Sequence, residues 1–361
     1  MKATHIITAA IAVVLLVASG WWYLNRRAPH LIQFPAATAA ADSGAFSYER
    51  YAAALARYVD DRGMVNYRSL KANSGDLDAF SASLSLVKPG EFDSWGDQQK
   101  IAFWINAYNA LTLEAIIRNY PIKSSLVRSV VYPKNSIRQI PGVWDQLRFV
   151  VAGREMTLNE IEHSALRAKF SEPRIHVALV CAAMSCPPLR NEPYAAENLD
   201  QQLDDQARTF LRSSHSLRIN RGKATVYLSP IFQWFGEDFI KTYGTSDNFA
   251  GKSDTERAVL NFISRYVSEA DRDFLLHARY KIEFLDYDWS LNKQKKRLTS
   301  EVRRHNNEQS PTGRHYRRIG ARILWPRMGA PRPSAGRSHR GAGACQSFRS
   351  RRPPRPIARL D

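Results

Sequence analysis

The stretch Arg174-Ile-His-Val-Ala-Leu-Val-Cys-Ala-Ala-Met-Ser-Cys-Pro-Pro-Leu189 holds the densest group of reactive side chains in this chain. An apolar run contains His176, two cysteines stand at its end, and a double proline follows them. Proline has no backbone N–H and stops a regular element. We therefore expect a buried segment that ends abruptly and carries Cys181, Cys186 and His176 as candidates for chemistry.

Helical patterns outnumber strand patterns on both sides of this stretch. The longest periodic segment covers residues 98–120 and ends at Pro121. Further helices are expected at residues 47–60, 77–87, 157–170, 199–211, 230–243 and 255–267, and strands at 147–151, 154–157, 217–220, 225–228 and 281–286. Because the strands come as hairpins rather than βαβ units, we predict an α+β fold. It would be a helix-rich single domain with small antiparallel hairpins, behind an N-terminal hydrophobic helix.

The net charge of +18 belongs to one end of the chain. Residues 293–361 hold 19 Lys and Arg against three acids, so the 292 residues before them carry a net charge of only +2. The segment lacks apolar periodicity and is expected to be disordered. A polybasic arm for lipid or nucleic acid is one interpretation, but we favour a segment without a selected role, such as the product of a shifted reading frame. Nucleic acid is therefore an unlikely partner despite the basic tail.

The N-terminus carries an apolar run of 19 uncharged residues, 6–24, which just suffices to span a bilayer as a helix. Trp21, Trp22 and Tyr23 suit the membrane interface, whereas Ala18-Ser19-Gly20 resembles a signal-peptidase site. We expect residues 1–27 to be a signal anchor or signal peptide, 28–45 a tether, and 46–292 the globular domain. The protein would be a single-pass inner-membrane protein with this domain in the periplasm, or a periplasmic protein after cleavage.

Three motifs in one order make the globular region similar to a known family. Residues 102–111 (AFWINAYNAL), 158–163 (LNEIEH) and 174–188 (RIHVALVCAAMSCPP) resemble the DUF547 family, a domain of unknown function found in bacteria and plants. The resemblance covers roughly residues 48–292 if the closing Tyr287-Asp-Trp-Ser-Leu-Asn292 is included. It implies no established reaction, so any function must be argued from the residues.

The first functional interpretation is a thiol nucleophile with a histidine base. Cys186 or Cys181 would attack, and His176 or His163 would depress the thiol pKa and accept its proton. Asn106 or Asn109, on the long helix, would orient the imidazole, as in other Cys/His/Asn acyl-transfer sites. The plainer alternative is that Cys181 packs in the core and Cys186 is a turn residue.

The two cysteines have other interpretations. A disulfide is possible in an exported domain if the intervening residues form a loop, because side chains five apart on one helix point away from each other. A zinc site has little support, since there is no second cysteine pair. We predict neither a metal nor a cofactor.

Polar residues on the long helix form a second group of candidates. Trp104, Asn106, Tyr108 and Asn109 share a helix whose apolar face must be buried and which is expected to face residues 174–189, where Ser185 directly precedes Cys186. These side chains would bind a ligand, or they would form hydrogen bonds with N–H and C=O groups of the irregular backbone near the prolines. His163 is likewise more often a core histidine than a base.

Two function classes follow from these candidates. One is an exported hydrolase or acyl transferase that depends on cysteine and histidine. The other is a non-catalytic binding domain for an unknown small molecule, peptide or cell-wall fragment. The sequence indicates no oligomeric state.

Overall fold

The computed structural model describes residues 11–17, 19–20, 30–34, 46–245 and 248–295. Most of the predicted tether and nearly all of the predicted basic tail lie outside these ranges. Of the predicted span at residues 6–24, residues 11–17 and 19–20 are described and are helical. Within the described part of the chain, no helix is long and apolar enough to cross a membrane.

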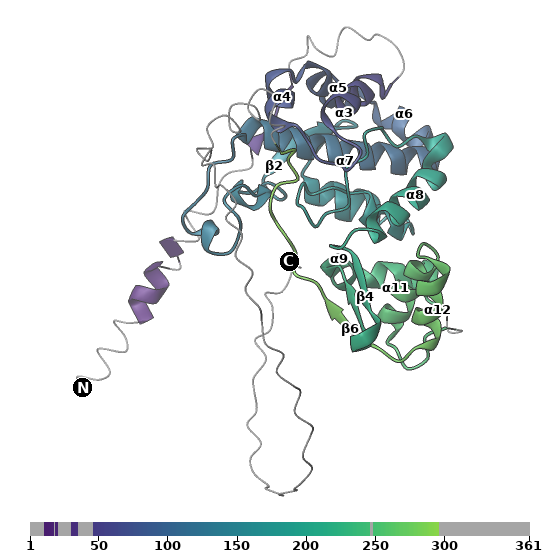
Figure 1. Ribbon diagram of the computed structural model, residues 1–361. Coiled ribbons are helices and arrows are strands. Elements are labelled where there is room, and N and C mark those ends of the chain that lie inside the picture. The colour runs from purple at the N-terminus through teal and green to yellow at the C-terminus, as the bar shows by residue number, and fades with distance from the viewer. Residues whose placement is uncertain (1–10, 18, 21–29, 35–45, 246–247, 296–361) are drawn as a thin grey trace, which may run out of the picture. The chain divides into compact units, whose positions relative to one another are not determined.

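A long central helix, α7 (Asp97–Asn119), organises the first hydrophobic core. Every residue from Ile101 to Ile117 is buried, so this helix is covered on all sides rather than on one face. Figure 1 shows it among the other helices of this core. These are α3 (Glu49–Tyr58), α4 (Tyr67–Ala72), α5 (Gly75–Leu86), α6 (Pro89–Ser94), α8 (Leu199–Leu211) and the π-helix η3 (Glu160–Arg167).

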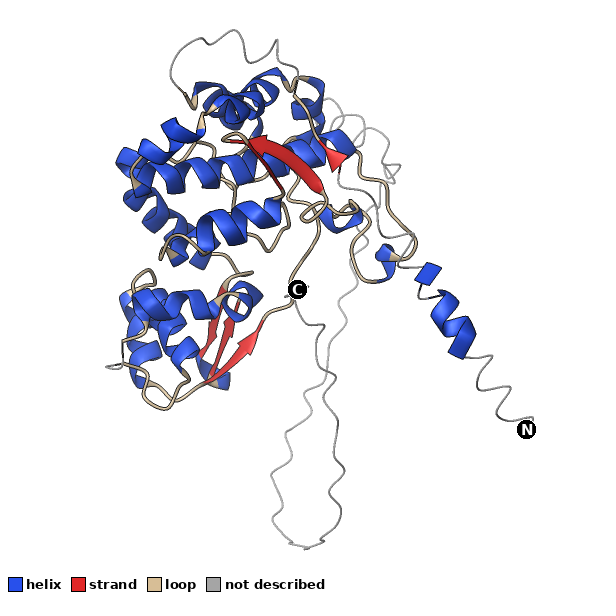
Figure 2. Cartoon of the chain, turned by 180° about the vertical axis from the view of Figure 1, so that it is seen from behind, coloured by secondary structure: helices blue, strands red, loops and turns tan. Residues whose placement is uncertain are grey.

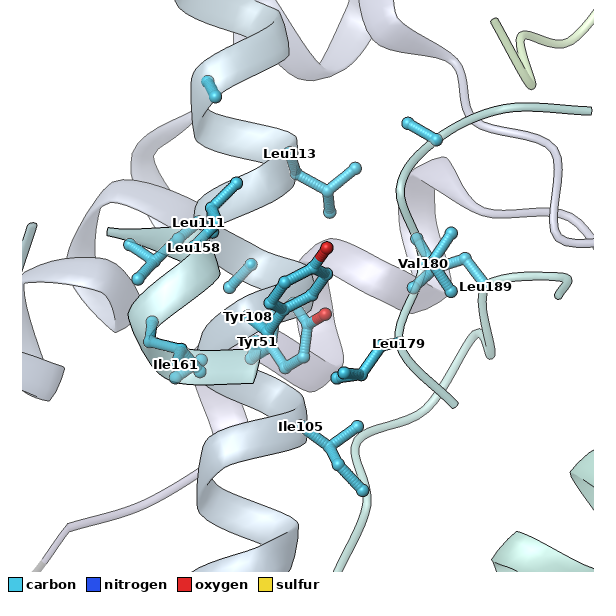
Figure 3. Close-up of a cluster of buried hydrophobic side chains, with 14 of the residues drawn as sticks. Tyr51, Ile105, Tyr108, Leu111, Leu113, Leu158, Ile161, Leu179, Val180 and Leu189 are labelled. Carbon is cyan, nitrogen blue, oxygen red and sulfur yellow. The ribbon is translucent and has the colours of Figure 1, made fainter. Parts of the chain in front are cut away.

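Side chains from three parts of the chain meet against α7. Tyr108 lies beside Tyr51 of α3 and faces Leu179 and Val180, which belong to the stretch of residues 174–189 (Figure 3). Ile161 of η3 packs on the same helix and is fully buried. The expected burial of residues 174–189 is thus explained by their packing against α7.

A second core is built around aromatic rings. Phe232, Phe239 and Phe262 lie within 6.0 Å of one another between ring centroids and are almost fully buried. The elements that supply this core are α9 (Pro230–Trp234), η7 (Gly236–Phe239), α10 (Ile240–Tyr243), α11 (Asp254–Ser264) and α12 (Glu269–His277). They pack with strands β4 (Leu217–Asn220), β5 (Thr225–Leu228) and β6 (Lys281–Phe284).

The two small sheets are mixed rather than purely antiparallel. Each predicted hairpin is present: β2 (Leu147–Val151) pairs antiparallel with β3 (Arg154–Met156), and β4 pairs antiparallel with β5. However, β1 (His30–Leu31) adds to β2 in parallel and β6 adds to β5 in parallel (Figure 2). The α+β prediction is therefore confirmed as a helix-rich fold, and the predicted hairpins form parts of small mixed sheets.

Short 3₁₀ helices make up much of the remaining chain. They are η1 (Arg128–Val130), η2 (Ile137–Gln139), η4 (Pro173–Val177), η5 (Ala196–Asn198) and η6 (Arg221–Lys223). Two of them, η1 and η2, lie in the connection between α7 and β2, where the sequence predicted no element. That connection supplies side chains to the candidate site described below.

One predicted helix is broken. Residues 230–243 form α9, η7 and α10 in succession instead of one helix. The break falls at Gly236, where an added Cβ would lie 2.5 Å from Cγ2 of Thr255. The chain thus passes close to α11 at a point where only glycine fits.

Candidate functional site

The reactive stretch folds as a 3₁₀ helix followed by turns. After η4, Ala182 adopts a positive φ of 60°, and the chain loops back so that Cys181 and Cys186 form a disulfide. Their Cα atoms are 6.2 Å apart, within the usual range for such a bond. The loop required by the disulfide interpretation is therefore present.

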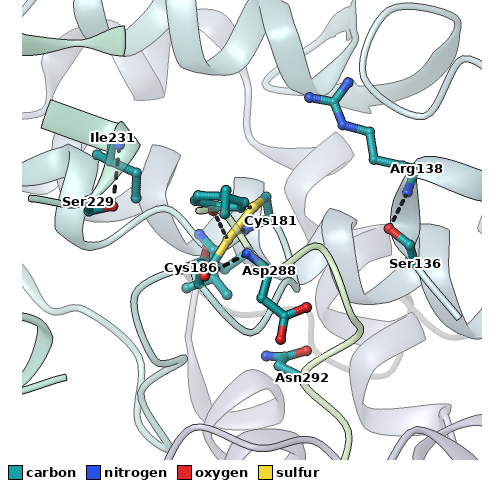
Figure 4. The surroundings of a disulfide bond; sticks show 12 residues. Ser136, Arg138, Cys181, Cys186, Ser229, Ile231, Asp288 and Asn292 are labelled. Atoms are coloured by element: carbon teal, nitrogen blue, oxygen red, sulfur yellow. Dashed lines mark hydrogen bonds between the residues drawn. A yellow bond between two sulfur atoms is a disulfide. The ribbon is translucent and has the colours of Figure 1, made fainter. Parts of the chain in front are cut away.

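The last described segment of the chain holds this loop in place. Backbone N–H groups of Met184 and Ser185 donate to the carbonyl groups of Ser290 and Asp288. The N–H of Asp288 in turn donates to Oγ of Ser185 at 2.8 Å, so this fully buried hydroxyl is engaged by backbone (Figure 4). The hydroxyl of Tyr287 lies 3.3 Å from the sulfur of Cys181 and 3.1 Å from that of Cys186.

Neither candidate histidine contacts a cysteine sulfur. His176 Nε2 lies 2.7 Å from Oδ2 of Asp238, and His163 Nδ1 lies 2.8 Å from Nη1 of Arg167. A disulfide sulfur is not a thiolate and cannot serve as the nucleophile. The thiol interpretation therefore applies only to a reduced form of the loop, and the structure does not bring the four predicted catalytic side chains together as a unit.

A buried ionic network surrounds His176 instead. Arg167 donates to both carboxylate oxygens of Asp238, at 2.6 and 3.0 Å. Burial acts to raise the pKa of Asp238, but the hydrogen bonds from His176 and Arg167 hold it well below its usual value. Burial lowers the pKa of His176 despite Asp238, and the ring stacks on Phe235 at 4.3 Å. The network fixes residues of η3, η4 and η7 relative to one another.

The amides predicted on the long helix clamp irregular backbone. Asn106 donates to the carbonyl of Tyr194 at 2.7 Å and accepts from its N–H at 2.9 Å. Asn109 donates to the carbonyl of Ala178 and accepts from the N–H of Val180. Their hydrogen-bonding groups are thus occupied by the protein, and this agrees with the plainer of the two sequence interpretations.

Trp104 and Tyr108, the aromatic candidates of α7, have different surroundings. Trp104 is buried against Phe92 and Phe103 at ring distances of 5.3 and 5.2 Å. Tyr108 is hydrogen-bonded to Glu162 and to Trp144, and burial raises its pKa well above the usual value. Tyr108 therefore connects the buried helix to the partly exposed residues of the site.

Glu162 is a carboxyl group with unusual surroundings in this region. Burial raises its pKa to about 7, against the opposing effects of Arg167 and of the Tyr108 hydrogen bond. Among the described residues, no cation forms an ion pair with Glu162, and Arg167 is bound to Asp238. Burial thus favours the protonated form of Glu162.

Arg138 of η2 is the feature that the sequence candidates missed. Its guanidinium carbon lies 4.2 Å from the ring centroid of Trp289, 4.7 Å from that of Trp144 and 5.4 Å from that of Tyr132. Among the described residues its guanidinium has no hydrogen-bonded or ion-paired partner, and Nε is fully buried without one. Burial lowers its pKa, consistent with a cation that lacks a compensating carboxylate.

We call the residues around Arg138 the aromatic site; some of them, such as Tyr108 and Cys186, are buried, and others, such as Trp144 and Trp289, are partly exposed. Trp289 contacts Tyr287 at 4.6 Å between ring centroids, and Tyr287 contacts both sulfurs of the disulfide. Its members are Tyr108, Tyr132, Arg138, Trp144, Glu162, Cys181, Cys186, Trp234, Tyr287 and Trp289. The clue in the sequence was the absence of any acidic residue from 115 to 144, a segment that contains Arg138.

Among the described residues, neither a cluster of metal ligands nor the cavity near β1 includes the site residues predicted from the sequence. Within the described ranges, no three His, Cys, Asp or Glu side chains gather in a way that would hold a metal ion. A cavity of about 1020 Å³ lies against β1 and the end of α7, lined by residues that include His30, Glu114 and Arg118. None of the sequence-predicted site residues lines it.

Comparison with known proteins gives one match. The family model described as "Protein of unknown function, DUF547" matches residues 92–211. No curated protein and no solved structure matches the chain. The matched region contains Trp104–Asn109, Arg138, His163, His176 and the disulfide.

Proposed function

Because residues 92–211 carry the DUF547 domain that the sequence motifs indicated, and this family has no stated reaction, we propose a function from the site alone. The proposal is that residues 46–292 form a non-catalytic domain that binds a carboxylate-bearing small molecule, peptide or cell-wall fragment at the aromatic site. We further propose that the domain is exported and held at the membrane by residues 6–24, as the apolar run and its aromatic end indicate.

The observation that carries this proposal is the unpaired guanidinium of Arg138. A guanidinium presents donors in a planar fork that matches the two oxygens of a carboxylate. The rings of Trp144 and Trp289 hold that fork in one orientation, which lowers the entropy cost of binding. A ligand carboxylate would also supply the charge that the chain itself does not provide.

The alternative of a cysteine-dependent hydrolase has less support. It requires reduction of the disulfide and a rearrangement that brings His176 or His163 to a sulfur, although His176 is stacked on Phe235 and bound to Asp238. Alkylation by iodoacetamide after mild reduction separates the two functions. A thiol with a pKa well below about 8.5 would favour the enzyme.

The binding proposal is tested with the fluorescence of Trp144 and Trp289 as the signal. The probes are N-acetylated tripeptides with a free C-terminal carboxylate, and the same peptides with a C-terminal amide. We expect saturable quenching or enhancement with the acids and none with the amides. Arg138→Met should weaken binding at least about tenfold, since a charge-assisted bidentate pair contributes roughly 1.5–3 kcal/mol.

Arg138→Lys is the matched control, because it keeps the charge and loses the planar fork. Its affinity should lie between those of the native protein and Arg138→Met. Equal binding of acids and amides, or unchanged affinity in Arg138→Met, would contradict the proposal. Peptide turnover by the oxidised protein would contradict its non-catalytic part.

A further inference from the structure

The connection between α7 and β2 exposes a group of large aliphatic side chains. Leu126 is 93% exposed, Val127 73%, Val130 86% and Val131 67%. They lie within six consecutive residues around the short 3₁₀ helix η1, which covers Arg128–Val130. We call residues 125–132 the apolar turn. Single exposed aliphatic residues are common on protein surfaces, but a contiguous group of four indicates an interaction site.

Hydrogen bonds within the turn keep its backbone in order. The N–H of Ser129 donates to the carbonyl of Ser125 at 2.9 Å, and that of Tyr132 donates to the carbonyl of Arg128 at 2.8 Å. Arg128 anchors the turn to η2, since its Nη1 donates to the carbonyl groups of Arg138 and Ile140 at 3.1 and 3.3 Å. The four aliphatic side chains are therefore held outward by a defined backbone.

Gln139 provides a second anchor from inside the protein. Its side chain accepts from the N–H of Ser125 at 2.9 Å and donates to Oγ of Ser129 and to the carbonyl groups of Tyr132 and Pro133. Gln139 is only 2% exposed. A buried amide that uses its hydrogen bonds to hold an exposed apolar turn favours a built surface over a loosely packed loop.

The connection that contains the apolar turn carries side-chain charge of one sign. No Asp or Glu occurs from residue 115 to residue 144, whereas Lys123 and Lys134 flank the turn and are exposed. The connection therefore combines exposed aliphatic side chains with exposed lysines.

We propose that the apolar turn inserts into the interfacial region of an anionic lipid bilayer. Leu126, Val127, Val130 and Val131 would enter the boundary between headgroups and acyl chains, and Lys123 and Lys134 would lie at the headgroups. The positive charge of the lysines attracts an anionic lipid surface. The same charge would repel a second copy of this basic turn. The contact is independent of the ligand proposed at Arg138.

A depth-sensitive probe tests insertion in the full chain. Val130→Cys is labelled with the environment-sensitive dye NBD in a Cys345→Ala background, under non-reducing conditions that leave the Cys181–Cys186 disulfide intact. Vesicles contain phosphatidylcholine alone or with phosphatidylglycerol. Leu86→Cys, at an aliphatic position that is 57% exposed on α5, is the matched control. Because the dye reports its own surroundings, binding through residues 6–24 or through the basic tail does not imitate the signal.

We expect a blue shift and an intensity gain at position 130 with phosphatidylglycerol vesicles, and no shift at position 86. Lys123→Gln with Lys134→Gln should lower the insertion equilibrium by roughly tenfold or more, because each basic residue near an anionic surface contributes about fivefold. Absence of the shift while the protein sediments with the vesicles would overturn the proposal. An equal shift on neutral vesicles would overturn its anionic part, and a concentration-dependent shift without vesicles would show that a second copy occupies the turn.

Discussion

Two half-buried arginines of this protein have opposite surroundings. Arg174 donates to Glu172, Asp200 and Asp204, with N–O distances between 2.6 and 2.7 Å for the closest contacts. Burial acts against its charge, but these carboxylates raise its pKa above the ordinary value. Arg138 instead faces three aromatic rings and no carboxylate, and burial lowers its pKa.

The difference separates a structural arginine from a candidate binding arginine. Residues of the protein occupy the hydrogen-bond donors of Arg174, and these contacts hold η4 against α8. Arg174 therefore has no free donor for a ligand. Arg138 is positioned equally firmly, by stacking, but its donors remain unused by the described residues. A cation that is held in place and left unpaired is the arrangement expected where a partner from outside completes the ion pair.

The largest expected effect is on stability at Arg174. Arg174→Met leaves Glu172 and Asp204 without their cation in a partly buried position, so the free energy of unfolding should fall by about 3 kcal/mol. Urea denaturation measures it. Arg221→Met, which breaks the more exposed pair with Asp271, is the control and should cost less than about 1 kcal/mol. Similar losses in both variants would contradict the distinction drawn for Arg174.

The disulfide should contribute a smaller amount. Replacing both Cys181 and Cys186 by Ala removes a cross-link over a sequence separation of 5, which should lower the free energy of unfolding by about 2 kcal/mol. Because Tyr287 contacts both sulfurs and Trp289, tripeptide affinity should fall as well. Cys345→Ala should change neither quantity. Unchanged stability of the double variant under oxidising conditions would show that the bond does not constrain the native protein.

A still smaller effect concerns Glu162, whose pKa is raised by burial to about 7. The native state holds the proton more tightly than the unfolded state, so stability should decline as pH rises from about 4.5 to about 7. The part due to Glu162 is on the order of 1 kcal/mol after allowance for partial exposure. Glu162→Gln should remove that part of the pH dependence of stability. The pKa of Glu114 is raised by burial to about 8, so Glu114 accounts for the remaining decline of stability with rising pH.

Carboxyl ¹³C NMR provides the direct measurement for Glu162. A titration midpoint below 4.5 would show that a cation pairs with it in solution. Repeating the titration in Arg138→Met identifies that cation, since the midpoint should stay near 7 if the two groups are independent.

The smallest effect is expected for the stability of Arg138→Met. Loss of cation–π contact costs about 1 kcal/mol, but removal of an uncompensated buried cation offsets part of this. The net change in the free energy of unfolding should therefore lie within about 1 kcal/mol of zero, although ligand binding is impaired. A loss as large as that in Arg174→Met would show that Arg138 is structural.

Local patterns in the sequence predicted most elements of the fold. The hairpin strands of residues 147–156 and 217–228 are present, and α7 begins and ends within one residue of the predicted bounds. At the start of the predicted helix of residues 157–170, Thr157 and Glu160 exchange hydrogen bonds at 3.1 and 2.7 Å, as in a capping box. Hairpins, caps and amphipathic helices are decided by neighbours in sequence, and this explains why they could be predicted.

Contacts between distant segments could not be predicted in the same way. Parallel pairing of β6 with β5 depends on where α11 and α12 return the chain, and no local pattern encodes it. The short helices α4, α6 and α12 were missed because six to nine residues give little periodicity. The aromatic site was missed because Trp289 reaches Tyr132, Arg138 and Trp144 from a segment far away in the sequence.

Because residues 287–294 attach to the disulfide loop, the aromatic site is completed late in the synthesis of the domain. Asn292 and Gln294 pair with Val65, while Asp288 and Ser290 pair with the loop at Met184 and Ser185. Tyr287 and Trp289, two walls of the aromatic site, are thus among the last residues of the domain to be translated. A nascent chain that has already folded α7 still lacks part of the aromatic site, and a chain truncated at residue 286 would never acquire it.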